Sequence, residues 1–159
     1  MRKNMSGSLL IELMIVVAIM GLLAMLGMPS FMRFLAKTKR TEAYVNLNAI
    51  YAAQKAYFAE HGTYSTQLRG ENSVGWCPEG YHGGGADENF NYTYGFSGAE
   101  GKNYFTGKLN APGSSLSAAR ADSKGFVAVA AGDIDGDGNL DIVTIDDNKN
   151  IRIAQDDLA

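Results

Sequence analysis

Hydrophobic residues are distributed very unevenly along this chain of 159 residues. Residues 9–28 form an apolar run of twenty residues in which Glu12 is the one charged side chain. A helix of this length spans about 30 Å, which is enough to cross the hydrocarbon core of a bilayer. A carboxylate in that core costs roughly 2.5–3.5 kcal/mol on insertion scales and usually marks a function. We therefore expect a transmembrane helix over 8–28 that does more than anchor the chain.

The hydrophobic pattern becomes amphipathic after Pro29. Side chains of one face recur at steps of three and four residues, which predicts that the helix continues over 29–62. These side chains are Ala43, Leu47, Ile50, Gln54, Tyr57 and Phe58. Gly62 is suited to end the helix. Because Pro29 removes a backbone donor and Gly21 and Gly27 lower helix propensity, we expect a bend or a locally melted stretch between Gly21 and Pro29.

Strand patterns begin in the second half of the chain. Residues 66–89 are rich in turn formers and predict a variable loop. The segments that predict strands are 91–97, 104–109, 126–131, 140–145 and 151–154. Short polar turns join the last three, so we expect an antiparallel sheet of four to five strands over about 90–155. The expected fold class is α+β, with the long N-terminal helix packed on this sheet in a globular head over 63–159.

The charge of the chain excludes some functions and suggests one contact. A net charge of −3 is too small to indicate nucleic-acid binding, so we predict no direct nucleic-acid partner. With two His and one Cys, the sequence shows no nucleophile–base set, and we do not expect an enzyme. Residues 133–159 contain eight Asp, whereas basic residues follow the apolar run at Arg33, Lys37, Lys39 and Arg40. These opposite charges would favour head-to-tail contact between copies, although solvated faces give the same pattern.

One acidic segment has the spacing of a calcium-binding loop. Carboxylates occupy relative positions 1, 3, 5 and 9, and Gly138 stands at position 6. The candidate ligands are Asp133, Asp135, Asp137, Asn139 and Asp141. The twelfth position is Thr144 instead of a bidentate carboxylate, and Asp146 or Asp147 could substitute. Calcium could secure the C-terminal half, because the single Cys77 excludes an intrachain disulfide. The alternative is an acidic hairpin turn without a metal.

The N-terminal residues form a further pattern. A glycine and a serine precede the apolar run, a glutamate is the fifth residue from the serine, and a glycine and a proline follow. These residues are Gly7, Ser8, Glu12, Gly21 and Pro29. The pattern resembles the N-terminus of type IV pilins and pseudopilins, and residues 39–65 resemble the helix of major type IV pilins. The chain departs from the family at Ser8, where Phe is usual, and at Leu9, where Thr or Ser is usual.

The resemblance implies a sequence of processing and assembly. A prepilin peptidase would cleave the leader, residues 1–7, between Gly7 and Ser8 and methylate Ser8. The carboxylate of Glu12 could then neutralise the new N-terminal amine of a neighbouring copy, which would fix the register of stacked helices. The assembly residues are Glu12, Gly21 and Pro29. The implied partners are other pilin copies, which form a homopolymer, and the inner-membrane pilus assembly machinery.

The resemblance also implies where the protein resides. It predicts a single-pass protein of the bacterial inner membrane with a cytoplasmic N-terminus, which becomes part of an extracellular filament after assembly. More basic residues follow the apolar run than precede it, so the charge count alone favours the opposite orientation. We follow the leader pattern instead. We expect a structural subunit of a type IV pilus, with motility, adhesion or DNA uptake left open. The alternatives are a pseudopilin of a type II secretion system and a membrane-anchored calcium-binding module that never polymerises.

Overall fold

The computed structural model describes residues 6–159, and within them it contains one long helix and a six-stranded sheet. The elements are α1 (Ser6–His61), β1 (Thr93–Gly95), β2 (Tyr104–Phe105), the 3-10 helix η1 (Gly113–Leu116), β3 (Arg120–Ala121), β4 (Phe126–Gly132), β5 (Asp141–Asp146) and β6 (Ile151–Gln155). The predicted α+β class is confirmed. The chain divides into two units, Met1–Leu35 and Ala36–Ala159.

The described part of the first unit is helical throughout. Residues 6–35 all belong to α1, and Pro29 lies inside the helix. Of the two expected alternatives between Gly21 and Pro29, a bend or a locally melted stretch, the melted stretch is therefore wrong for this chain. A proline removes one backbone donor, but the flanking turns keep their hydrogen bonds, so the helix continues through it. Residues 1–5, most of the expected leader, lie outside the described residues.

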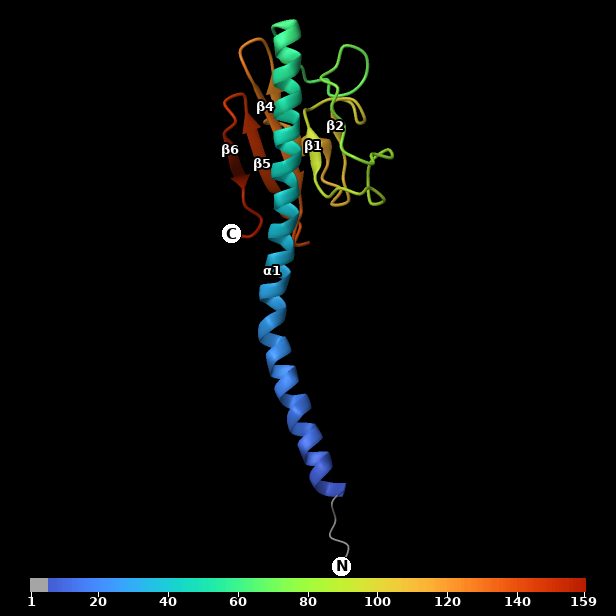
Figure 1. The fold of residues 1–159 in the computed structure, drawn as a ribbon, viewed down its shortest axis with the longest axis vertical. Coiled ribbons are helices and arrows are strands. Elements are labelled where there is room, and N and C mark those ends of the chain that lie inside the picture. The colour runs from blue at the N-terminus through green and yellow to red at the C-terminus, as the bar shows by residue number, and fades with distance from the viewer. Residues whose placement is uncertain (1–5) are drawn as a thin grey trace, which may run out of the picture. The chain divides into compact units, whose positions relative to one another are not determined.

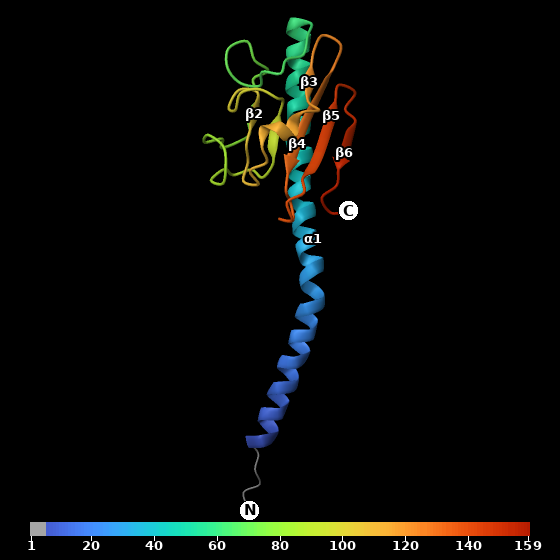
Figure 2. The same cartoon turned by 180° about the vertical axis from the view of Figure 1, so that it is seen from behind.

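In the second unit, the remaining part of α1 packs against one face of the sheet. This segment crosses in front of the strands in Figure 1 and lies behind them in the reverse view of Figure 2. The helix ends at His61, and Gly62 follows with φ +68° and donates its N–H to the carbonyl of Phe58. A glycine in the left-handed backbone conformation commonly follows the last residue of a helix. The predicted stripe is confirmed, since none of the surface of four of its side chains is exposed: Ala43, Leu47, Ile50 and Gln54.

The strands are antiparallel and follow the order β2-β1-β4-β5-β6, with β3 also paired to β4. The longest ladder joins β4 to β5, from Val127 opposite Asp146 to Gly132 opposite Asp141. All five predicted strands are present, although β1 and β2 are shorter than expected. The prediction of four to five strands missed β3. A strand of two residues has no alternating pattern, and its conformation depends on the neighbouring β4.

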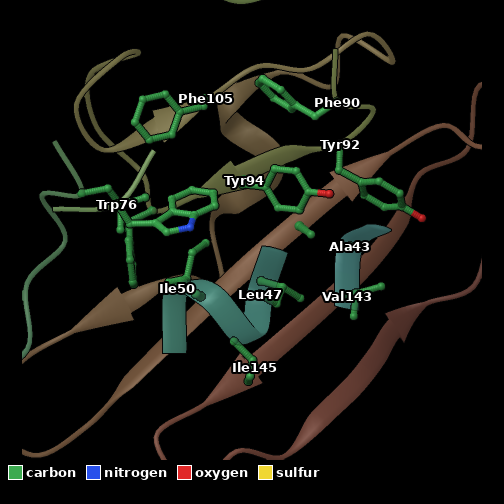
Figure 3. Close-up of a cluster of buried hydrophobic side chains, with 14 of the residues drawn as sticks. Ala43, Leu47, Ile50, Trp76, Phe90, Tyr92, Tyr94, Phe105, Val143 and Ile145 are labelled. Atoms are coloured by element: carbon green, nitrogen blue, oxygen red, sulfur yellow. The ribbon is translucent and has the colours of Figure 1, made fainter. Parts of the chain in front are cut away.

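A core of large side chains fills the space between α1 and the sheet. Leu47 and Ile50 of the helix lie close to Tyr94, Val143 and Ile145 of the strands (Figure 3). The loop over 66–89 has no regular secondary structure, as predicted, and contributes one buried aromatic side chain to the core. That side chain is Trp76, whose ring centroid lies 6.1 Å from that of Tyr94 and 5.8 Å from that of Phe105. The head therefore contains a single tryptophan that reports on its packing.

Candidate functional site

The apolar side chains of residues 9–35 are exposed around the helix. The large apolar residues of this segment have exposed fractions between 40% at Leu35 and 77% at Met25. One stretch of eighteen residues within α1 has a mean hydropathy of 2.8, and none of it is buried. A soluble protein would bury such a helix in its core, whereas its length and composition suit a membrane span. The segment thus presents a large apolar surface to its surroundings.

The predicted processing and assembly residues all lie on α1. Gly7 and Ser8 fall at its start, and Glu12 follows one turn beyond Ser8. A Cβ atom added to Gly21 would meet nothing within 4 Å, so this glycine is not required for packing within the chain. The residues are spread from the first turn to Pro29 along one helix. The chain by itself does not gather them into a single site.

The predicted calcium loop connects β4 to β5, and part of it forms a cluster of carboxylates. One carboxylate oxygen from each member lies within 4.8 Å of the others, and the members are Asp133, Asp135, Asp137 and Asp157. Gly136 and Gly138 have φ values of +87° and +93°, which glycine adopts without strain. Their N–H groups donate to the two carboxylate oxygens of Asp133 at 2.6 and 2.9 Å. The loop backbone therefore fixes Asp133 within the cluster.

The predicted ligands did not include Asp157, which lies two residues beyond β6 and is 7% exposed. Its Oδ2 accepts hydrogen bonds from the N–H groups of Ile134 at 2.8 Å and Asp135 at 3.4 Å. Its Oδ1 is buried and has no hydrogen-bond partner among residues 6–159. Burial raises the pKa of Asp157, the hydrogen bond from Ile134 opposes this rise, and the charges of Asp135 and Asp133 add to it. The sequence alone offers no signal for Asp157, because it is distant from the loop along the chain.

The structure places Asp141 and Asn139 differently from the prediction. Asp141 is fully buried and accepts hydrogen bonds from Arg40 Nε at 3.0 Å, Arg40 Nη2 at 2.5 Å and the Tyr92 hydroxyl at 2.7 Å. It is thus engaged with the helix instead of the acidic cluster. Asn139 donates its side-chain amide to Asp137 Oδ2 at 2.8 Å. Asp146, one of the two suggested closing ligands beside Asp147, accepts hydrogen bonds in the turn between β5 and β6.

Arg40 connects α1 to the C-terminal segment. Its Nη2 also contacts Asp156 Oδ1 at 2.5 Å. Burial lowers the pKa of Arg40, but the hydrogen bonds to Asp141 and Asp156 outweigh burial and raise it above the usual range. The hydrogen bond from Arg40 in turn lowers the pKa of Asp156. Lys39 Nζ donates to the carbonyl of Ile134 at 2.8 Å. Two of the four basic residues therefore bind the acidic segment of their own chain, whereas head-to-tail contact between copies stays a prediction.

Glu42 is a second helical side chain whose role the sequence did not indicate. It lies outside the apolar stripe, yet its Oε1 accepts hydrogen bonds from the Asn91 N–H and the Tyr94 hydroxyl, both at 2.8 Å. Burial, and then the charge of Glu42, raise the pKa of Tyr94. Glu42 therefore fixes the start of β1 against α1, as Arg40 fixes the start of β5.

Comparison with known proteins gives one informative similarity. No protein-family model matches the chain. A type IV major pilin protein PilA from Myxococcus xanthus (strain DK1622) is 49% identical over 73 residues, which is 46% of this chain and 32% of the relative. The match thus covers less than two thirds of that relative's length. Over the matched residues the chain is therefore similar to a type IV major pilin, and it also has an exposed apolar helix and a helix-on-sheet head.

Proposed function

We propose that this chain is a structural subunit of a type IV pilus, cleaved after Gly7 and polymerised through α1 into a surface filament. A structural role, as opposed to an enzymatic one, is inferred from the name of the pilin relative. Before assembly the chain would span the bacterial inner membrane with a cytoplasmic N-terminus. A prepilin peptidase would process it there, and the assembly machinery would combine it with other copies. Motility, adhesion and DNA uptake are all compatible with such a subunit.

The observation that supports this proposal most strongly is the exposed apolar surface of residues 9–35. An anchor would need apolar character alone, but this segment also has small residues at open positions. Gly21 and Gly27 leave space where a second helix can approach the backbone closely. Dispersion contacts of that kind drive helix association in lipid, where the hydrophobic effect between helices is absent. The surface therefore suits a helix that leaves the lipid to pack against copies of itself.

Glu12 supplies the specificity for this packing. Cleavage after Gly7 would place a positively charged amine at Ser8, four residues from Glu12. Within a single helix both groups extend from the same backbone, so a neighbouring copy offers the better-aligned partner. A charged pair in an apolar filament core stabilises only when the axial offset of the two helices brings the groups together. The pair would therefore select one register among the many that an apolar surface allows.

Intact-mass measurement on two cell fractions tests the proposal. Protein sheared from the cell surface is expected to have a mass that begins at Ser8, with or without one methyl group. Glu12→Ala should leave the protein inserted and cleaved but sharply reduce its amount in the sheared fraction. Glu60→Ala, which removes an exposed carboxylate from the same helix, is the matched control and should shear like the wild type.

Two outcomes would contradict the proposal, and a third would contradict the role of Glu12 alone. An uncleaved chain beginning at Met1 would mean that the leader is not processed. A cleaved chain found solely in membranes would indicate a pseudopilin. Normal filaments from Glu12→Ala would refute the role of the Glu12 carboxylate in register.

A further inference from the structure

We infer that Asp133, Asp135, Asp137 and Asp157 form a calcium site in which Asp157 closes the coordination shell. The inference concerns the head and does not depend on polymerisation. It differs from the sequence-based ligand set in three ways. Asp157 enters from the C-terminal segment, and Asp141 leaves because Arg40 and Tyr92 bind it. Asn139 also leaves, because its side-chain amide donates to Asp137.

The first support for the site is the arrangement of charge. Four carboxylates within 4.8 Å of one another repel strongly unless protons or a cation neutralise them. The loop backbone nevertheless keeps Asp133 turned toward the others through the N–H groups of Gly136 and Gly138. A structure that holds like charges together in this way is stable when a cation lies among them.

The second and independent support is the Oδ1 atom of Asp157. This carboxylate is 7% exposed, and its Oδ2 is satisfied by backbone N–H groups of Ile134 and Asp135. Its Oδ1 is buried without a hydrogen-bond partner within the described residues. A buried carboxylate oxygen without a donor is costly, and a metal ion is one of the few groups that can satisfy it. One carboxylate oxygen of Asp157 lies within 4.8 Å of an oxygen of each of the other three, so the carboxylate that carries this unsatisfied atom borders the acidic cluster.

The chemistry of the ligands selects a hard divalent cation. All four side chains offer carboxylate oxygens, and calcium accepts six to eight oxygen ligands in an adaptable geometry. Asp135 and Asp137 are exposed, so water can complete the shell on the outer side. Magnesium requires a near-ideal octahedron and dehydrates reluctantly, which makes a loop carrying several convergent carboxylates a poorer site for it.

A cation at this position would join two parts of the head. It would bind the β4–β5 loop to Asp157, whose own N–H points toward Asp141 Oδ1 at 3.4 Å. The neighbouring Asp156 contacts Arg40 of α1, and Arg40 also binds Asp141. Calcium would therefore fix the C-terminal residues to the loop, next to the point where Arg40 already holds Asp156 to the helix.

Calcium titration of the full chain in detergent micelles tests the inference. After chelator treatment, calcium is expected to raise the thermal midpoint, followed by Trp76 fluorescence, and to protect the C-terminus from carboxypeptidase. Asp157→Asn should weaken the calcium response by roughly tenfold or more, because the ligand that loses its charge is the buried one. Asp87→Asn, the same change at an exposed loop position outside the cluster, should respond like the wild type.

A second variant covers the case in which Asp157→Asn does not fold. Asp135→Asn changes an exposed member of the cluster, so it should preserve the fold and still weaken the calcium response. Absence of any calcium response in the wild type would overturn the inference, as would an unchanged response in both variants. An equal response to magnesium would overturn the assignment to calcium. None of these results depends on filament formation, so they are separate from the test of the pilus subunit.

Discussion

The buried ion pair between Arg40 and Asp141 permits a quantitative prediction about the head. Asp141 accepts two hydrogen bonds from Arg40, one from Tyr92 and a longer one from the N–H of Asp157, and it has no exposed surface. Asp141→Ala removes all four, although Arg40 keeps its contact with the partly exposed Asp156. Breaking a buried pair by removing one partner costs about 3–5 kcal/mol. Because Asp156 compensates in part, we expect a loss at the lower end, about 3 kcal/mol of the free energy of unfolding.

Urea denaturation of the full chain in micelles, followed by Trp76 fluorescence at fixed calcium concentration, measures this loss. Asp147→Ala, a partly exposed carboxylate beside β5, serves as the control and should change stability by no more than about 0.5 kcal/mol. The double variant Arg40→Met with Asp141→Leu should recover much of the loss, since an apolar pair of similar volume leaves no buried charge. Strictly additive effects of the single changes at Arg40 and Asp141 would refute the reasoning, because contacting partners must couple.

Two further predictions concern the backbone of β1 and the loop before it. Gly95→Ala should destabilise the head by about 1–3 kcal/mol in the same assay. Gly95 has φ +131°, and an added Cβ would lie 2.9 Å from the Cα of Tyr104. Unchanged stability would show that β1 and β2 can separate at no cost. Burial raises the pKa of Glu88, but N–H groups of Gly84 and His82 outweigh burial and hold it below the usual 4.5. The unfolded chain therefore binds more protons, so the contribution of Glu88 is present above about pH 4.5 and is lost as the pH falls through its folded pKa. The urea midpoint of Glu88→Gln should accordingly fall less than that of the wild type between pH 6 and acidic pH, and parallel pH profiles would contradict this.

The elements that the sequence predicted correctly are those with a long local pattern. The apolar run of residues 9–28, the stripe through Leu47 and Ile50 and the end at Gly62 are all encoded within neighbouring turns of one helix. The β4 and β5 strands were equally visible, because each contains Val, Ile, Thr or Phe residues in a short run that stands between clear turns. The melted stretch before Pro29 was predicted wrongly, since lowered propensity disfavours a helix without excluding it.

The candidate site was predicted only in part, because its decisive contacts join distant segments. The spacing of Asp133, Asp135 and Asp137 is local, and these three residues do converge. Asp157 reaches them only because β6 returns beside β5, a pairing that the sequence of the loop does not contain. Asp141 fits the loop spacing equally well, but Arg40, 101 positions away, binds it instead. Side-chain type and spacing therefore located the loop, whereas the sheet topology decided its members.

The edge position of β6 has a consequence for how these heads behave when they are crowded. β6 is the last strand of the sheet, and four of its five residues are exposed, so its outer backbone groups could pair with a strand of another chain. Two features oppose such pairing: the register shifts between Ile142 and Val143 in the ladder with β5, and β6 carries the charged Arg152 beside Ile153. An irregular, short and charged edge is a poor template for amyloid-like growth. Many copies can therefore be held close together while aggregation through their sheets is suppressed.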